Sequence, residues 1–192
     1  MKKIIYTICA AAMATVALAG CAGNHGVIAN KAISSRQDVF QEAQTGQVTE
    51  GKAMLDVMFP VKSYETYFLN TYIKHTDPPY NAILNIDGQA VVLSDEPQLE
   101  NLPGDFRTNP EVGTGWKYNF RKTLALQPGK HSIMVAVPLA DVMVEKTIEL
   151  KAGENSLKVL PIYNSSVSRN SWIPRFSHGL QGIAIKINDQ DC

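Results

Sequence analysis

The chain has 192 residues, of which 45% are hydrophobic and 19% are charged, so it is long enough to bury the core of one domain. Its 18 basic and 18 acidic side chains cancel at pH 7, with the four histidines neutral. A chain without excess positive charge lacks the field that tracks nucleic acid, which argues against charge-driven binding to nucleic acid or to anionic lipid.

The first 20 residues have the parts of a secretory signal peptide. Lys2 and Lys3 form a positive start, and an apolar stretch follows from Ile4 to Ala19, interrupted by two threonines. This stretch is near the lower limit of roughly 17–25 residues for a helix that spans a bilayer. Because small residues end it, we interpret it as a segment for cleavage rather than as a membrane anchor.

The tetrad Leu18-Ala19-Gly20-Cys21 closes the apolar stretch and resembles the lipobox of bacterial lipoproteins. The resemblance implies that residues 1–20 are removed and that the Cys21 thiol carries a diacylglyceryl group. Two or three acyl chains hold a protein on a membrane stably, whereas one chain binds marginally. The next residue is alanine, not the aspartate that resembles an inner-membrane retention signal, so the resemblance implies the outer membrane. The alternative is an ordinary signal peptide followed by a structural cysteine.

Cleavage after residue 20 would leave 192 − 20 = 172 residues with 18 − 2 = 16 basic and 18 acidic side chains, a formal net charge of −2. Of the three cysteines, Cys9 leaves with the signal and Cys21 is consumed by lipid. Cys192 then remains alone, so the fold cannot depend on an internal disulfide. This last thiol either pairs with another chain or has no role.

Residues 21–50 are predicted to form a lipidated tether and a short helix. The stretch Ser35-Arg36-Gln37-Asp38 resembles a capping box, and Val39, Phe40 and Ala43 provide one apolar stripe. We therefore expect a flexible tether of about ten residues and then a helix that ends at Gln44.

Residues 51–192 consist of short segments rich in β-branched and aromatic residues, mostly separated by turn formers. Eight or nine strands at this spacing predict an all-β fold, a single immunoglobulin-like or prealbumin-like β-sandwich. Asp87-Gly88 predicts a two-residue type I′ hairpin, and the turns at 127–129 and 151–155 are expected to close later hairpins in the same way. Trp116, Tyr118 and Phe120 would share one face of an extended strand.

Residues 124–163, LALQPGKHSIMVAVP…EKTIELKAGENSLKVLPIY, are similar to the PEGA-like and transthyretin-like modules of bacterial envelope proteins. These modules share a strand, a Pro-Gly-(Lys/Glu)-His hairpin, a strand, and a later strand that ends in a Gly-Glu-Asn-type turn. The resemblance covers about 40 of the 192 residues and implies a β-sandwich without enzymatic activity. The long insert at 94–115 departs from the compact module.

Motifs for catalysis and cofactor binding are missing from the sequence: there is no G-x-S-x-G, H-E-x-x-H, G-x-G-x-x-G or Walker pattern. The histidines, His25, His75, His131 and His178, lack the spacing of a metal site. We therefore expect no enzyme, no cofactor and no metal. A hydrolase remains the alternative if His75, His131 and His178 converge with an aspartate in three dimensions.

Two long segments are predicted to be irregular, residues 94–115 and 164–181. The first holds three prolines, three glycines and five acidic residues against Arg107 alone. Loops longer than about 12–15 residues are often functional or disordered. A binding loop, a weak Ca²⁺ site and a plain solvated loop are the three interpretations of this segment.

The second segment mixes aromatic and basic residues, a combination typical of protein interfaces. We therefore select five residues as candidates for partner binding: Trp172, Arg175, Phe176, His178 and, from the first segment, Phe106. The alternative is that Trp172 and Phe176 plug one end of the sandwich.

These observations predict a lipid-anchored outer-membrane lipoprotein with a non-catalytic domain, a binding or assembly module for another envelope protein. The acidic and basic segments are expected to face the same end of the domain, where opposite charges would help to fix the surface. The sequence leaves open whether the domain faces the periplasm or the medium. A carbohydrate-binding module is a further alternative, and it requires Trp116 or Trp172 to be exposed and flat.

Overall fold

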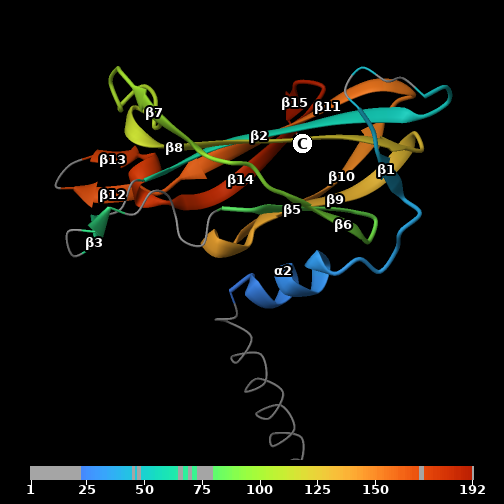
Figure 1. Ribbon diagram of the computed structural model, residues 1–192, viewed down its shortest axis with the longest axis horizontal. Coiled ribbons are helices and arrows are strands. Elements are labelled where there is room, and N and C mark those ends of the chain that lie inside the picture. The colour runs from blue at the N-terminus through green and yellow to red at the C-terminus, as the bar shows by residue number, and fades with distance from the viewer. Residues whose placement is uncertain are drawn as a thin grey trace, which may run out of the picture.

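Two β-sheets packed face to face make up most of the structure, as the predicted all-β sandwich requires (Figure 1). This computed structural model describes residues 23–44, 46, 49–64, 67–68, 71–72, 80–168 and 171–191. For residues 67–68, 71–72, 166–168 and 171–172 it describes the backbone alone. In the described part of the chain, no helix has the length and apolar character needed to cross a bilayer.

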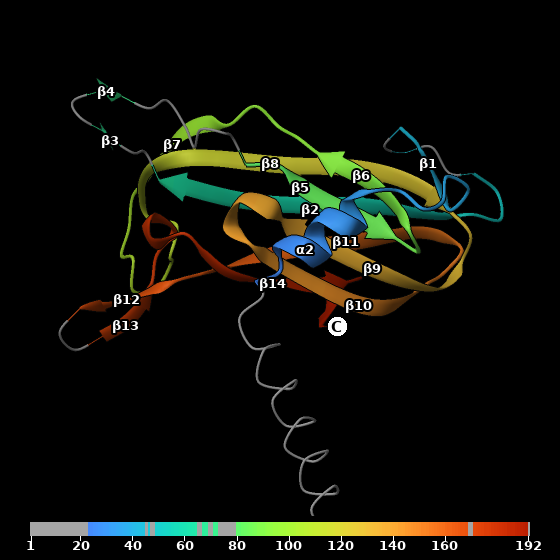
Figure 2. The same cartoon turned by 90° about the horizontal axis from the view of Figure 1, so that it is seen from below.

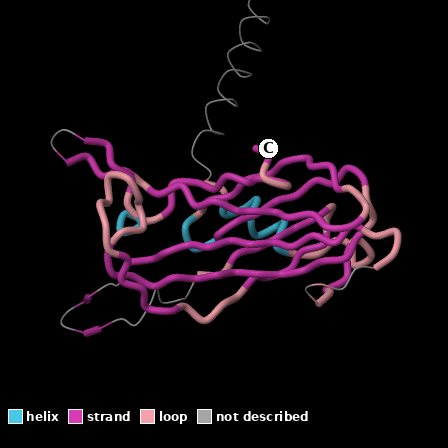
Figure 3. Tube along the Cα trace, turned by 90° about the horizontal axis from the view of Figure 1, so that it is seen from above, coloured by secondary structure: helices cyan, strands magenta, loops and turns pink. Residues whose placement is uncertain are grey.

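The larger sheet has seven strands in the order β1-β8-β2-β11-β14-β15, with β7 also paired to β8. The smaller sheet has four strands in the order β10-β9-β5-β6, and β3–β4 and β12–β13 form separate two-stranded pairs. β2 and β11 run parallel, whereas the other described pairs are antiparallel. The strands follow the long axis of the molecule (Figure 3). Their bounds are β1 Phe40–Glu42, β2 Ala53–Tyr64, β3 Tyr67–Phe68, β4 Thr71–Tyr72, β5 Ala82–Ile86, β6 Gln89–Leu93, β7 Gln98–Leu102, β8 Gly113–Leu126, β9 Gly129–Val137, β10 Val142–Leu150, β11 Gly153–Tyr163, β12 Ser165–Ser168, β13 Ser171–Pro174, β14 Leu180–Ile187 and β15 Gln190–Asp191.

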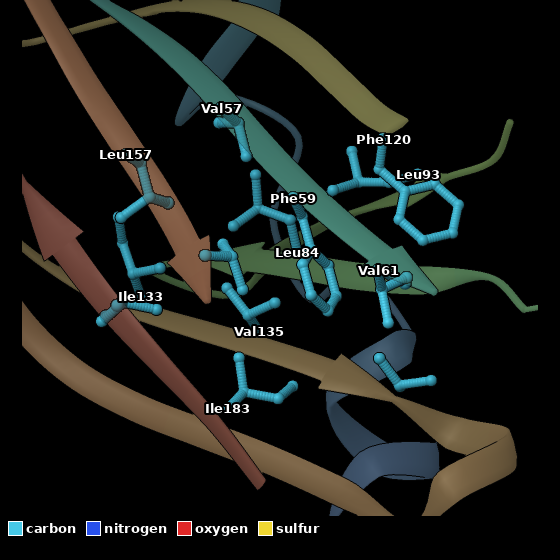
Figure 4. Close-up of a cluster of buried hydrophobic side chains, with 14 of the residues drawn as sticks. Val57, Phe59, Val61, Leu84, Leu93, Phe120, Ile133, Val135, Leu157 and Ile183 are labelled. Carbon is cyan, nitrogen blue, oxygen red and sulfur yellow. The ribbon is translucent and has the colours of Figure 1, made fainter. Parts of the chain in front are cut away.

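The core lies between the two sheets because alternate residues of each strand point inward (Figure 4). Phe59 of β2 packs against Phe120 of β8, with ring centroids 5.8 Å apart. Trp116, Tyr118 and Phe120 are all buried, which confirms their predicted common face. Burial of each large apolar side chain contributes about 1.5–3 kcal/mol, so this face is a main source of stability.

The turn between β5 and β6 is the predicted two-residue hairpin, since Asp87 and Gly88 both have positive φ, 48° and 92°. The expectation for the two later turns is wrong. Residues 127–129 join β8 to β9, and residues 151–152 join β10 to β11, and in both cases the two strands belong to different sheets. Turn residues signal that the chain reverses, but they do not show whether the next strand pairs or crosses the core.

The N-terminal helix lies earlier than predicted. Helix α2 spans His25–Ala32, and residues 40–42, expected to be helical, form strand β1. The side chain of Gln89 explains the extended backbone, because it accepts hydrogen bonds from the Val39 and Phe40 N–H groups and donates one to the Phe40 carbonyl. Arg36 pairs with Asp38, so the expected capping side chain has another partner.

Helix α2 packs across the outer face of the four-stranded sheet and adds a third layer to the fold (Figure 2). Ile28, the buried residue of the helix, contacts a small cluster formed by Ile83, Met134 and Ala136. At the start of the helix, the Asn24 side chain donates to the Asp141 carbonyl at 2.9 Å. Only residues 22–24 separate this docked helix from Cys21.

The two segments predicted to be irregular contain regular structure. Residues 94–115 include β7, which pairs with β8, and residues 164–181 include β12, β13 and the 3₁₀ helix η2, Phe176–His178. A second 3₁₀ helix, η1, spans Pro138–Ala140. The sequence does not indicate these short elements, because each has few residues, a weak alternation of apolar and polar side chains, and turn-forming residues around it.

Candidate functional site

The two long segments meet at one end of the sandwich, as predicted. The Phe176 N–H donates a hydrogen bond to the Pro110 carbonyl at 3.0 Å. The guanidinium of Arg175 lies over the Phe106 ring, 4.5 Å from its centroid. Among the described residues, the segments are thus joined by a backbone hydrogen bond, a cation–π contact and the packing of the Phe176 ring on Gly113 and Gly115, and no ion pair of the expected kind joins them.

Phe176 is not an exposed anchor, which corrects its place among the candidates for partner binding. Its side chain is 3% exposed and its ring lies against Gly113 and Gly115 of β8. A Cβ atom at Gly115 would come within 2.5 Å of the ring and of the Ser63 carbonyl. Phe176 therefore plugs this end of the sandwich, as the alternative interpretation proposed.

A buried lysine holds the base of this end together. The side chain of Lys62 is fully buried, and its Nζ donates to Glu100 Oε2 at 2.9 Å, to the Glu111 carbonyl at 3.0 Å and to the Gly113 carbonyl at 2.7 Å. The ammonium group also lies 5.0 Å from the centroid of the Phe176 ring. Every donor of this ammonium has an acceptor, so its burial is compensated.

Tyr163 joins the same group of polar side chains. Its hydroxyl donates to Glu111 Oε1 at 2.7 Å and accepts from the Lys62 backbone N–H at 2.9 Å. Burial raises the pKa of the Tyr163 hydroxyl well above its ordinary value, and the negative charge of Glu111 raises it further. Glu111 also forms an ion pair with Lys117. The sequence alone does not reveal this group, because a lysine in an alternating strand is normally expected to face solvent.

Phe106 is presented by a tight turn. Asp105 accepts hydrogen bonds from the backbone N–H and the Nε of Arg107, at 2.9 and 3.0 Å, and these bonds lower the pKa of the Asp105 carboxyl. The Thr108 hydroxyl donates to the Asp105 carbonyl at 2.9 Å. The residues on both sides of Phe106 are thereby tied to each other, while its ring stays 37% exposed.

We call this region the end surface and define it as the exposed or half-exposed residues Tyr64, Leu99, Phe106, Arg175 and His178. Tyr64 and Leu99 flank β8, opposite Gly115 and Trp116. The side chain of Trp172 lies outside the described residues, so its predicted role stays a prediction. The end surface combines apolar rings with one cation, a combination that is common in protein interfaces.

The described histidines do not converge. His131 is buried, its Nδ1 lies 2.7 Å from Asp87 Oδ2, and its Nε2 lies 2.8 Å from the Gln127 carbonyl. His178 follows β13 near the start of β8, whereas His131 follows the end of β8, so the length of that strand separates them. His75 lies outside the described residues. Among those described, no group of three His, Cys, Asp or Glu is arranged to hold a metal ion.

A second feature is a cavity of about 330 Å³ beside helix α2. Its walls include Lys31, Asn85, Asp87, Ser132 and Glu145. Glu145 accepts hydrogen bonds from Lys31 and Ser132, and the bond from Lys31 is the main cause of its lowered pKa. Lys31 and Glu145 pair with each other, and Asp87 lies 2.7 Å from His131 Nδ1, so each charged group of these walls already has a partner within the protein.

Trp116 is one of the two tryptophans that could stack on a carbohydrate. Its side chain is 7% exposed and lies in the core, so it does not form such a platform. No protein-family model, no curated protein and no solved structure matches this chain. A function must therefore be inferred from its own residues, chiefly the tetrad at 18–21 and the end surface.

Proposed function

We propose that this protein is a lipid-anchored lipoprotein of the outer membrane whose domain is a non-catalytic binding or assembly module for another envelope protein. The tetrad Leu18-Ala19-Gly20-Cys21 supports the lipid anchor, because it lies directly after a positive start and an apolar stretch. The pair formed by Phe106 and Arg175 is the observation that carries the binding function.

Arginine and aromatic side chains dominate the energetics of protein interfaces when they are held in place before the partner arrives. Phe106 is held by the bonds between Asp105 and Arg107, and the Arg175 backbone N–H, next to the buried Phe176, donates to the Asn164 carbonyl at 3.1 Å. The group around Lys62 keeps the underlying backbone rigid. A partner would therefore lose little conformational entropy of this protein on binding.

The anchor is tested by mass spectrometry of the mature protein from a Gram-negative host. We expect an amino-terminal peptide that begins at Cys21 and carries acyl groups. A Cys21→Ser variant should keep its signal peptide and lack the acyl mass, while the matched Cys9→Ser variant should mature normally. A mature chain with a free Cys21 thiol, or one that begins elsewhere, would overturn the lipoprotein proposal.

The binding function is tested by a photoreactive amino acid placed at position 106 in the lipidated protein in cells. The control position is Ile162 on β11, which is also exposed but lies outside the end surface. We expect one envelope protein to be captured at 106, at a level that falls when Arg175 is changed to Ala, and to bind the purified protein directly. Identical captured proteins at 106 and 162 would contradict the end surface as a binding site.

A further inference from the structure

Exposed apolar side chains gather around helix α2. Ile33, directly after the helix, is 72% exposed, and Val92 of β6 is 56% exposed. Val27 of the helix and Leu139 of η1 are also exposed. The helix contacts both β6 and η1, so the four side chains lie on neighbouring elements.

These side chains belong to one face of the molecule, which we call the α2 face and define by Val27, Ile33, Val92 and Leu139. Val92 is paired with Ile83, whose side chain packs under the helix, so Val92 points to the same side of the four-stranded sheet as α2. Figure 2 shows the helix crossing this sheet on the side toward the viewer.

The charges near the α2 face are compensated locally. Lys31 pairs with Glu145, and His25 Nδ1 lies 3.4 Å from Asp141 Oδ1. The opposite side of the molecule also carries paired charges, Lys158–Asp189 and Lys186–Asp191, but among the described side chains of β11 and β14 Ile162 is the one large apolar residue that is exposed. The two faces therefore differ in their exposed apolar side chains, four on the α2 face against one on the opposite face, rather than in unpaired charge.

The short connection to Cys21 limits where the α2 face can lie. An extended chain spans at most about 3.6 Å per residue, so His25 is within about 14 Å of the Cα atom of Cys21. The helix cannot move away from its sheet freely, because Ile28 is buried and Asn24 is bonded to Asp141. An acylated Cys21 would thus keep this face next to the lipid headgroups.

We propose that the α2 face rests on the surface of the bilayer, with the four-stranded sheet toward the lipid and the seven-stranded sheet away from it. This inference rests on the lipid anchor proposed above. Apolar side chains on such a surface enter the boundary between headgroups and acyl chains, where their area is removed from water. The anchor supplies the attachment, and the α2 face fixes the orientation.

The test uses vesicles of phosphatidylethanolamine and phosphatidylglycerol that contain a phospholipid with a photoactivatable headgroup. The lipidated protein is bound, irradiated and digested, and the labelled peptides are identified by mass spectrometry. We expect label in residues 25–36, 89–93 and 138–141 and none above background in residues 157–163. Equal labelling of the two sides, or labelling of 157–163 alone, would overturn the orientation.

Matched variants make the test specific. Ile33→Asp should reduce the label in residues 25–36 several-fold, whereas Ile162→Asp, at an exposed site on the opposite side, should leave it unchanged. Both positions are exposed, so neither change threatens folding. Equal effects of the two variants would contradict the proposal.

A second form of the protein distinguishes a failure of the proposed orientation from a failure of the proposed lipid anchor. A Cys192→Ser chain that begins at Cys21 is coupled through its Cys21 thiol to a maleimide phospholipid in the same vesicles. Uniform labelling of this form overturns the orientation, whatever happens in cells. A one-sided pattern in this form, together with a Cys21 without acyl groups in cells, overturns the lipid anchor alone.

Discussion

Lys62 shows how one residue can determine the shape of the end surface. Its Nζ bridges β2 to two carbonyls and a carboxylate from the segment at 100–113. A buried ammonium is tolerated only with such a full set of acceptors, and the acceptors then depend on the lysine. The same bonds fix the path of the chain that leads to Phe106.

Replacement of Lys62 by Met should therefore destabilise the protein by about 3 kcal/mol, because the Glu100 carboxylate and two backbone carbonyls are left without their hydrogen-bond donor. Lys122→Met is the matched control: this lysine pairs with Glu42 nearer to solvent, and its loss should cost about 0.5 kcal/mol or less. Urea unfolding of both variants measures the difference. Equal losses in the two variants would show that Lys62 contributes no more than a surface pair.

The raised pKa of Tyr163 predicts how the stability of the protein changes at alkaline pH. Its pKa is raised in the folded protein, so the folded state keeps a proton that the unfolded chain releases near pH 10. The associated stability is fully present below about pH 10 and is lost as pH rises further. Tyr163→Phe should lower the free energy of unfolding at pH 7 by about 2 kcal/mol, because the Lys62 N–H and the Glu111 carboxylate lose their hydrogen bonds to the hydroxyl.

The same variant should then show a shallower loss of stability above pH 10 than the unchanged protein. Thermal unfolding followed by circular dichroism between pH 8 and pH 11.5 compares the two. Parallel curves over the whole range would mean that this hydroxyl does not hold its proton in the folded state.

At the scale of elements, helix α2 depends on one buried side chain. Ile28 packs against Ile83, Met134 and Ala136, and the helix has no capping side chain at its start. A helix of eight residues is too short to be stable alone in water. The helix therefore forms because the sheet offers it an apolar site.

Ile28→Ala should release the helix without unfolding the sandwich, since the small cluster under α2 is separate from the main core. Hydrogen exchange of residues 25–32 should become faster by about tenfold or more, while β2 and β9 stay protected. Val27→Ala, at an exposed position of the same helix, is the control and should change neither. Faster exchange throughout β2 would show instead that the helix supports the whole fold.

The same dependence explains why the helix lies outside the range that the sequence predicts. A local pattern at 35–38 suggested a helix start, but Ser35 donates to the Gly88 carbonyl, Arg36 pairs with Asp38, and Gln89 holds the next residues extended. The β-sandwich itself was predictable, because short alternating strands and the Asp87-Gly88 turn carry a local signal. Local signals do not reveal which strands cross between sheets, and they do not reveal α2, whose stability is tertiary.

The candidate site was predictable to a similar extent. Phe106 and Arg175 were recognised by residue type, and their segments do meet. The burial of Phe176 was one of the two interpretations that the sequence left open, whereas the burial of Lys62 was not predictable, because it follows from two backbone carbonyls that lie far away in the sequence. Residue type indicates what a side chain can do, whereas burial decides whether it remains available.

At the scale of the whole molecule, the two proposals place the binding site relative to the membrane. Figure 1 shows α2 beneath the sandwich, while β7, β12 and β13 lie at one end of its long axis. In the proposed orientation the long axis lies along the bilayer, so the end surface points sideways. A partner held in the same membrane could then meet Phe106 and Arg175 without rotation of the domain.

This geometry predicts an effect of tether length that is independent of folding. Twenty Gly and Ser residues inserted after Ala22 would allow a separation of roughly 25 Å between the lipid and α2. The free energy of unfolding should not change, because α2 is held by Ile28 and Asp141 rather than by the tether.

Contact between the α2 face and lipid should nevertheless fall several-fold, since the lower effective concentration weakens a marginal contact. Lipid photolabelling of residues 25–36 and urea unfolding, measured on the same protein, provide the two readouts. Unchanged photolabelling would mean that the α2 face binds lipid without help from the short connection. A fall in both readouts would mean that residues near Ala22 contribute to the folded domain, and that the short tether has a structural purpose.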